Sequence, residues 1–242
     1  MNIQQKSVLI TGANRGIGRA LVAEALRRGV GRVYAGTRNA LDIDDPRITR
    51  IALDVTSRPQ ITSAAAAIAD LDILINNAGV ATYGDIANFD AIEQHLAVNL
   101  YGMLNLSRAF LPQLRRSRGA IVNQLSLAAI ASVPVMPAYS VSKAAAFNVT
   151  QGLRAYLAPE GVAVHSVFLG PIDTDMVRDL TLPKTPAEEA ARGIFDGLAA
   201  GEEDIFPDFA SHPIAGGWRE GVAKMLEHQF RAFVPANSSQ AA

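Results

Sequence analysis

The clearest indication of the fold is the segment Lys6-Ser7-Val8-Leu9-Ile10-Thr11, followed directly by Gly12-Ala13-Asn14-Arg15-Gly16-Ile17-Gly18. The first part is a short apolar run of strand length, and the second is a turn rich in glycine. Beyond it, apolar residues recur at helical spacing until Gly29, which is a helix stop. The stretch therefore predicts a strand, a glycine turn and a helix that packs on a sheet.

The spacing of the glycines suits a phosphate-binding turn. Gly12 allows the backbone to turn tightly, Gly16 allows a ligand to approach it, and Gly18 allows the helix to lie close to the strand. Free amides at the helix start would then face a pyrophosphate. The alternative is a turn that needs glycine only for its own conformation, but the position between strand and helix strengthens the functional interpretation.

Composition limits the class of protein. The 242 residues are 49% hydrophobic with a mean hydropathy of +0.15, which is enough for a sheet buried on both faces. We find no linker or internal repeat, so we expect one domain over residues 1–242, with 235–242 as a disordered tail. No secretion signal or membrane-spanning tract is visible. We therefore expect a soluble, cytoplasmic protein.

Charge and residue usage exclude several kinds of site. A net charge of −1 gives no long-range attraction for nucleic acid or a membrane surface. The absence of cysteine excludes disulfides, thiolate catalysis and cysteine-ligated zinc. The four histidines are scattered without metal-ligand spacing, so we predict no metal site.

The end of the second predicted strand, residues 32–37, indicates which dinucleotide would bind. An acidic residue there would hold ribose hydroxyls, but the chain has Thr37 and Arg38, with Arg15 nearby in the glycine turn. A guanidinium suits a phosphate, so we predict a preference for a 2′-phosphate. Arg38 could instead form a surface salt bridge. Its candidate partners are Asp42, Asp44 and Asp45, which would repel a phosphate if their loop folded inward.

Two further strand ends carry polar residues. Asp54, with Val55, ends the third strand and could bind an adenine amino group, or it could cap the helix that begins near Ser57. After the fourth strand, Asn76-Asn77-Ala78-Gly79 offers amide side chains and little bulk beside a ligand. The alternative is a simple turn, which asparagine and glycine also favour.

Tyr139 and Lys143 are the candidate catalytic pair. They lie four residues apart, which places both on one face of the predicted helix that ends near Leu157. A nearby ammonium favours the phenolate and lowers a phenol pKa of about 10. An isolated pair of this kind is more often a solvated surface pair, so the other motifs must decide. Ser126, thirteen residues before Tyr139, could bind a carbonyl oxygen.

A long helical pattern over residues 89–116 contains Asn99 at its beginning or at a bend, where it could also serve as a cap or backbone brace. The pattern is apolar on two sides. Since the domain core covers only one of them, we expect a symmetric oligomer, a homodimer or a homotetramer.

Together these motifs, in this order over residues 6–175, resemble the short-chain dehydrogenase/reductase family. The resemblance rests on residues 11–18, residues 76–79, Asn99, Ser126, the Tyr139/Lys143 pair and residues 170–174. It implies an α/β fold: a doubly wound Rossmann parallel sheet of about seven strands with helices on both faces.

The resemblance also implies roles for individual residues. Tyr139 would be the general acid in carbonyl reduction, and Ser126 would hold the substrate oxygen. Lys143 would bind the nicotinamide ribose and lower the pKa of Tyr139, while Asn99 would support a water relay to Lys143. The implied cofactor-binding residues, besides Asn99, Tyr139 and Lys143, are Gly12, Asn14, Arg15, Gly16, Ile17, Gly18, Thr37, Arg38, Asp54, Val55, Asn77, Ala78, Gly79, Gly170, Ile172 and Thr174.

Three departures from the family pattern affect the pocket. Gln124-Leu125 precedes Ser126 where relatives usually carry an apolar residue and a small hydroxyl. Leu169 replaces the usual proline, which predicts a mobile base for the lid at residues 175–184. The lid is short, which would leave the pocket open for bulky or varied ketones. Near the C-terminus we expect packing residues, although Trp218 could edge the pocket; they are Trp218, Met225, Leu226 and Phe230.

The leading hypothesis is an NADPH-dependent carbonyl reductase that acts reversibly as a secondary-alcohol dehydrogenase on a small or bulky hydrophobic ketone or alcohol. One alternative is an NAD-dependent alcohol dehydrogenase of the same fold. Another is a non-catalytic dinucleotide sensor that binds a partner protein, against which the combination of Ser126, Tyr139 and Lys143 argues.

Overall fold

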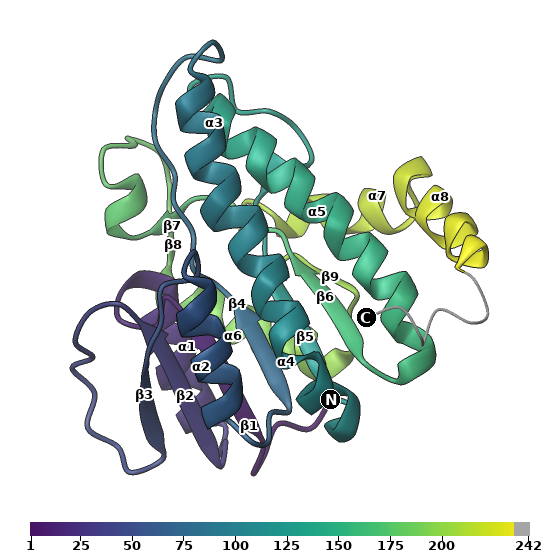
Figure 1. Ribbon diagram of the computed structural model, residues 1–242. Coiled ribbons are helices and arrows are strands. Elements are labelled where there is room, and N and C mark those ends of the chain that lie inside the picture. Colours follow the sequence, from purple (N-terminus) through teal and green to yellow (C-terminus); the bar gives the residue numbers. More distant parts are fainter. Residues whose placement is uncertain (235–242) are drawn as a thin grey trace.

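The computed structural model describes residues 1–234 and contains a seven-stranded sheet in which all paired strands are parallel (Figure 1). The strand order is β3-β2-β1-β4-β5-β6-β9. The strands are β1 (Ser7–Thr11), β2 (Arg32–Thr37), β3 (Ile48–Ala52), β4 (Ile73–Asn76), β5 (Ala120–Gln124), β6 (Ala163–Val167) and β9 (Asp204–Ile205). The order reverses between β1 and β4, which is where doubly wound sheets bind ligands beyond the strands' carboxyl ends.

Helices connect the strands and cover both faces of the sheet. The connecting helices are α1 (Gly16–Arg27), α2 (Arg58–Ala67), α3 (Phe89–His95), α4 (Met103–Ser117), α5 (Pro137–Leu157) and α6 (Ala187–Ala200). Two further helices, α7 (Ala215–Arg219) and α8 (Val222–Phe230), follow β9. The predicted doubly wound α/β fold is thus confirmed.

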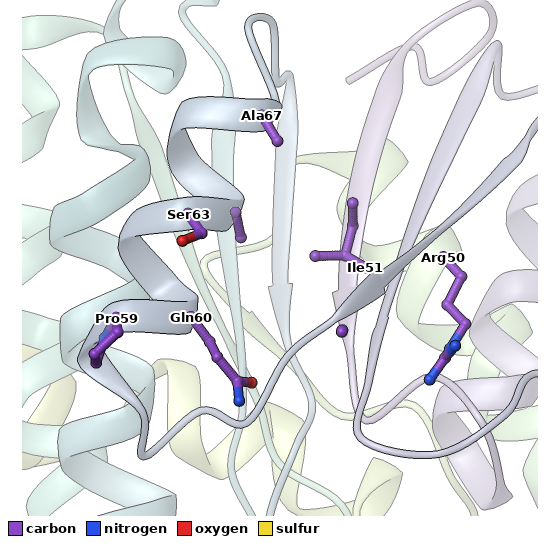
Figure 2. A pocket seen from close by; sticks show the side chains of 8 residues that line it. Arg50, Ile51, Pro59, Gln60, Ser63 and Ala67 are labelled. Carbon is purple, nitrogen blue, oxygen red and sulfur yellow. The ribbon is translucent and has the colours of Figure 1, made fainter.

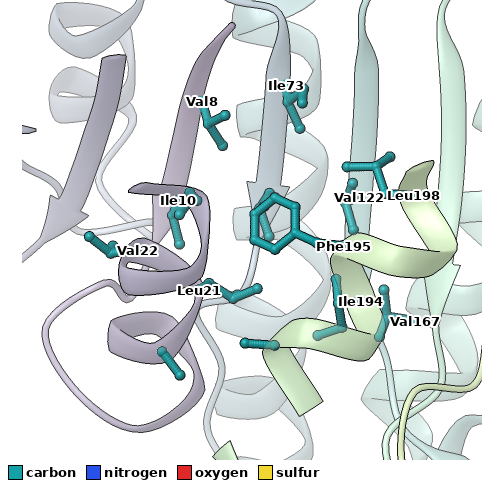
Figure 3. Packing of buried hydrophobic residues seen from close by; sticks show 14 of the residues in the cluster. Val8, Ile10, Leu21, Val22, Ile73, Val122, Val167, Ile194, Phe195 and Leu198 are labelled. Carbon is teal, nitrogen blue, oxygen red and sulfur yellow. The ribbon is translucent and has the colours of Figure 1, made fainter. Parts of the chain in front are cut away.

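The core consists of layers on either side of the sheet. Along β1, Val8 and Ile10 point to the face covered by α1 and α6, where Phe195 is completely buried (Figure 3). Leu9, between them, points to the opposite face and packs in the cluster that contains Phe110 of α4. Successive residues of a strand face opposite sides. A continuous apolar run such as residues 8–10 therefore supplies both layers.

The predicted helix over residues 89–116 is present, but a π-helical segment, Leu96–Gly102, interrupts it between α3 and α4. Asn99 lies in this segment and is buried. A π-helical turn adds a residue to the helical repeat and is often found at functional sites. Here it turns Asn99 towards α5, as its hydrogen bond to Ser142 demonstrates.

The lid is held at both ends. A small parallel pair, β7 (Ile172–Asp173) and β8 (Thr185–Pro186), joins the start of the segment to its end. Leu169 is buried, and the amide of Gly170 donates a hydrogen bond to Asp208. The base that the sequence predicts to be mobile thus has specific contacts.

The C-terminal helices only partly follow the prediction. Trp218 packs on Phe147, Phe168 and Phe206, so it is a packing residue as expected. Met225, Leu226 and Phe230, in contrast, are exposed, and their prediction as packing residues is wrong. Helix α8 is held instead by ion pairs from its polar face, and Figure 1 shows it beyond α5 at the side of the molecule. The predicted tail, 235–242, lies outside the described residues.

Candidate functional site

The glycine turn between β1 and α1 has the conformation that its sequence predicts. Gly12 and Gly16 have positive φ angles of 66° and 51°. A Cβ atom at Gly18 would lie 2.1 Å from the carbonyl oxygen of Gly12, so only glycine fits there. No side chain caps the N-terminus of α1. Its first amides therefore suit the phosphates of a dinucleotide, and the residues present fit such a cofactor.

Asn77 connects the turn to the neighbouring strand. Its side-chain amide donates hydrogen bonds to the backbone carbonyls of Thr11, at 2.7 Å, and Gly12, at 3.3 Å. The Thr11 hydroxyl accepts hydrogen bonds from the backbone amides of Asn77 and Ala78. Asn77 is therefore a brace of the glycine turn as well as a turn residue. Asn76 points the other way, to Asn123 and Ser107 in the buried layer beneath α4.

Ser126, Tyr139 and Lys143 converge at the carboxyl end of β5. Pro137 begins α5, where a missing amide hydrogen has no cost, and Tyr139 follows in its first turn. The Lys143 ammonium nitrogen lies 5.7 Å from the centre of the Tyr139 ring, so the pair does share one helix face. Ser126 caps a short 3₁₀-helix by accepting a hydrogen bond from the amide of Ala128.

The electrostatics of this group differ from the expectation. Burial raises the pKa of Tyr139 above its ordinary value, and the hydrogen bond with Ser126 lowers it only in part. Burial also lowers the pKa of Lys143 to about 8. The prediction that Lys143 lowers the Tyr139 pKa is therefore not met in this state, because burial has the largest effect on the phenol. The Lys143 ammonium donates instead to the carbonyl of Gln124, at 2.7 Å. The phenol keeps its proton at neutral pH.

Asn99 is a brace for the segment that follows β4. Its side chain accepts a hydrogen bond from the Val80 amide and donates one to the Val80 carbonyl, both at 2.9 Å. It also donates to the hydroxyl of Ser142, which in turn donates to the backbone carbonyl of Tyr139. A Cβ atom at Gly79 would lie 3.2 Å from the Asn99 side-chain oxygen and 3.8 Å from the Lys143 nitrogen. Asn99 and Lys143 thus border the same space.

The two arginines predicted for the 2′-phosphate are exposed, each with 69% of its side chain accessible. Arg38 lies 3.9 Å from Asp54, and Arg15 lies 3.7 Å from Asp175 at the start of the lid. The alternative partners of Arg38, at positions 42, 44 and 45, make no ion pair with it. Thr37 is buried and its hydroxyl accepts a hydrogen bond from the Asn39 amide.

The capping alternative for Asp54 is wrong. Ser57 is the N-cap of α2, since its hydroxyl accepts the hydrogen bond from the Gln60 amide. Asp54 accepts hydrogen bonds from the amide and hydroxyl of Thr56, and this contact lowers its pKa. Val55, next to it, is buried against Gly102.

At the start of the lid, Thr174 lies beside the glycine turn. A Cβ atom at Gly16 would meet the Thr174 methyl group at 3.1 Å. Ile172 is buried and Thr174 is half-buried. The structure therefore brings residues 12–18 and residues 172–174 to one edge of the sheet, as the motif order predicts. Ile17 and Asn14 belong to the same turn.

Two residues that the motifs leave out join this site. The Gln124 side chain donates a hydrogen bond of 2.6 Å to Asn77, and Ser142 receives one from Asn99. The only sequence signal for Gln124 is its departure from the family pattern. Ser142 carries none, because a serine inside a helix is ordinary until its partner is known.

One surface cavity lies apart from Ser126, Tyr139 and Lys143. A surface cavity of about 340 Å³ lies between β3 and α2, lined among others by Arg50, Gln60 and Ser63 (Figure 2). The lining of this cavity includes none of Ser126, Tyr139 and Lys143.

Within residues 1–234, no three metal-ligating side chains come together. No helix in that range is both long enough and apolar enough to cross a bilayer.

A family model described as short chain dehydrogenase matches residues 6–184, which include every motif named above up to the lid. The chain belongs to the short-chain dehydrogenase/reductase family. Members of this family are NAD(P)-dependent oxidoreductases, and the family's cofactor and small-molecule substrate would meet at the edge of the sheet where the glycine turn, Ser126 and Tyr139 lie.

Known relatives agree with this family membership. A short-chain dehydrogenase from Burkholderia cenocepacia, solved in complex with NADP, is 36% identical with a TM-score of 0.87, covering 97% of this chain and 100% of that one. The 1-deoxy-11-beta-hydroxypentalenate dehydrogenase of Streptomyces exfoliatus is 30% identical over 239 residues, 85% of this chain and 84% of that protein. The short chain dehydrogenase tazN of Aspergillus terreus is 33% identical over 198 residues, 73% of this chain.

Relatives differ in length. The match covers 43% of tazN and 50% of estradiol 17-beta-dehydrogenase 2 of Rattus norvegicus, so the chain spans about half the length of these curated relatives. These relatives share their family with this chain, but the substrates in their names are known only for those proteins.

Proposed function

We propose that this chain is an NADPH-dependent carbonyl reductase that acts reversibly as a secondary-alcohol dehydrogenase on hydrophobic ketones and alcohols. The observation that carries the proposal is the convergence of Ser126, Tyr139 and Lys143 at the carboxyl end of β5, with the phenol protonated at neutral pH. Hydrogen bonds from Gln124 to Asn77 and from Asn77 to the backbone connect this group to the glycine turn.

Tyr139 is the proton donor in this proposal. Its raised pKa keeps a proton available, and its hydrogen bond with Ser126 holds both hydroxyl groups close enough to meet one carbonyl oxygen. The bound reduced nicotinamide would supply the hydride. Because proton donation accompanies that transfer, negative charge on the substrate oxygen never accumulates without a donor.

Lys143 and Asn99 have supporting roles beside the proton donor Tyr139. The Lys143 ammonium is buried against the Tyr139 ring and would bind the hydroxyls of the nicotinamide ribose. Asn99 borders the same space near Gly79, which supports a role in a water relay that returns a proton to Lys143. Lys143 thus positions the cofactor and receives the relayed proton, and Asn99 supports the relay; neither residue acts on the substrate carbon.

The cofactor would extend from the lid base to the end of β2. Its pyrophosphate would face the amides of the glycine turn, its adenine would face Asp54 and Val55, and its carboxamide would face Ile172 and Thr174. The other residues proposed to line it are Asn14, Asn77, Ala78, Gly79 and Gly170.

Arg15 and Arg38 would favour NADPH over NADH. Both guanidinium groups are exposed and make only long contacts to a carboxylate, 3.7 Å and 3.9 Å, which a phosphate can replace. The binding of NADP by the Burkholderia cenocepacia relative supports the same choice. The long contacts also show the competing interaction: Asp54 lies close enough to weaken phosphate binding in part.

Exposed apolar side chains on three segments support a hydrophobic substrate. Val133 and Val135 precede α5, and Tyr83 lies on the segment whose Gly84 amide bonds to the carbonyl of Val135. Met176 and Leu182 are exposed on the lid. Apolar groups gathered on loops that adjoin a catalytic group suit an apolar ligand.

A homodimer or homotetramer is part of the proposal. Tyr101 of the π-helical segment and Val141 and Tyr156 of α5 are exposed apolar residues on the long central helices. A second copy of the chain would cover them. Light scattering on the purified protein tests this: a mass of one chain at micromolar concentration would contradict it.

Turnover with a panel of aliphatic, aromatic and polycyclic ketones, each with NADPH and with NADH, tests the function. We expect ketone-dependent oxidation of NADPH and a lower kcat/KM with NADH. Equal or better use of NADH would favour the NAD-dependent alternative. Tight NADPH binding without turnover of any ketone would favour the dinucleotide sensor.

A further inference from the structure

Gln124 occupies an unusual position between the two ends of the cofactor site. It is the last residue of β5, and 95% of its surface is buried, since its exposed fraction is 5%. Its backbone carbonyl accepts the hydrogen bond of Lys143, at 2.7 Å. Its side-chain amide donates a bond of 2.6 Å to Asn77, which in turn holds the glycine turn.

The direction of these hydrogen bonds is fixed by the backbone. The carbonyls of Thr11 and Gly12 can only accept, so Asn77 must present its amino group to them and its oxygen to Gln124. Gln124 must then donate through its own amino group. Its oxygen is left buried without a partner in the described part of the chain.

An unpaired buried oxygen carries a free-energy cost that an apolar side chain at this position would avoid. The site therefore gains something from the amide. We propose that Gln124 is a positioning residue for the dinucleotide: it ties the carbonyl that anchors Lys143, at the nicotinamide ribose, to the glycine turn that holds the pyrophosphate. This inference rests on the proposed cofactor site.

The chain offers a matched control for a buried glutamine. Gln113 in α4 is also buried, donates its amino group to two backbone carbonyls, those of Ala65 and Ile68, and leaves its side-chain oxygen without a partner among the described residues. It lies in the layer beneath α2, away from the glycine turn. A structural effect common to buried glutamines would appear at both positions.

The experiment compares Gln124→Leu, Gln124→Glu and Gln113→Leu with the wild type by fluorescence titration of NADPH and by thermal unfolding. Gln124→Leu removes the unpaired oxygen but leaves the Asn77 oxygen unpaired, so we expect a melting temperature close to that of the wild type. We expect its Kd for NADPH to rise about tenfold, which is the change in Kd that the loss of one hydrogen bond produces. Gln124→Glu places a carboxylate against the Asn77 oxygen, so its Kd rises further.

Gln113→Leu should leave the Kd for NADPH unchanged. The KM for the ketone, measured at saturating NADPH, should change less than the Kd in the Gln124 variants. A folded Gln124→Leu protein with a wild-type Kd would overturn the inference while leaving the proposed function intact. Failure of the wild type to bind either dinucleotide would instead overturn the proposed function.

Discussion

The Lys143 ammonium nitrogen lies 5.7 Å from the centre of the Tyr139 ring, with Lys143 buried and Tyr139 half-buried. The helix α5 fixes their spacing and β5 supplies the ammonium's acceptor. The two groups consequently shift in opposite directions: the phenol holds its proton more firmly, and the ammonium holds its proton less firmly.

Burial of Lys143 predicts a pH limit for cofactor use. Its pKa of about 8 in the folded protein means that the ammonium is present below that pH and lost above it. Since the ammonium would bind the nicotinamide ribose, kcat/KM for NADPH should fall about tenfold per pH unit above pH ~8. Steady-state rates from pH 6 to 10 measure this. Lys143→Arg, whose side chain stays charged, should be less active than the wild type but should not lose kcat/KM above pH ~8. A wild-type kcat/KM that stays constant up to pH 10 would contradict the binding of the ribose by the Lys143 ammonium.

Arg38→Ala should alter the choice of cofactor. Loss of charge-assisted hydrogen bonds to a 2′-phosphate would lower kcat/KM for NADPH by about 10- to 100-fold and leave that for NADH within about twofold. Arg32→Ala, an exposed arginine at the other end of β2, is the control and should change neither value. An equal loss with both cofactors would show that Arg38 does not read the phosphate.

Asn99→Ala should lower both stability and activity. The change leaves the amide and carbonyl of Val80 without their side-chain partner and removes the bond to Ser142. A fully buried unpaired group costs about 1–3 kcal/mol, and because Val80 is half-buried we expect a loss near the lower end of that range. Urea unfolding measures the loss. A variant as stable and as active as the wild type would show that this brace is dispensable.

The C-terminal helices depend on Arg154. This buried side chain donates to Glu227, Asp204 and Ser166 and links α5 to α8. Removal of one partner from a buried ion pair costs about 3–5 kcal/mol, so Arg154→Met should lower the free energy of unfolding by that amount at neutral pH. Arg219→Met, at an exposed ion pair, should barely change it.

The same network predicts a stability loss in acid. Burial alone would raise the pKa of Asp204, but Arg154 and Lys224 outweigh it and hold the pKa below the ordinary 3.8. A carboxylate whose pKa is lower in the folded than in the unfolded protein stabilises the fold at a pH above its unfolded pKa. This contribution is lost as the pH falls through the folded pKa. The stability difference between wild type and Arg154→Met should therefore narrow below about pH 4. A constant difference from pH 7 to pH 3 would contradict this.

Much of the fold is predictable from local patterns. Residues 6–18 predict β1, the turn and α1 because glycine spacing and apolar runs act locally. Other features depend on tertiary contacts. The π-helical segment around Asn99 and the exposure of Met225 and Phe230 follow from which neighbours the fold supplies, which no local pattern contains.

The candidate site divides in the same way. The order of the motifs predicts that Ser126, Tyr139 and Lys143 share one site, and the three do lie close together, with Lys143 near Gly79. The direction of the Tyr139 pKa shift was not predictable, because it depends on burial and on the contact with Ser126, both of which exist only in the folded protein. The hydrogen bond from Gln124 to Asn77 was not predictable either, since β4 and β5 are neighbours only in the folded sheet.

The most direct test of the account is the single-turnover rate of ketone reduction by Tyr139→Phe with saturating NADPH. The variant keeps the ring and loses only the proton that the account assigns to the carbonyl oxygen. We expect the rate to fall by about 10²- to 10⁴-fold with the Kd for NADPH little changed. Tyr156→Phe, an exposed tyrosine on the same helix, should react at the wild-type rate. An undiminished rate in Tyr139→Phe would show that the Tyr139 hydroxyl is not the proton donor.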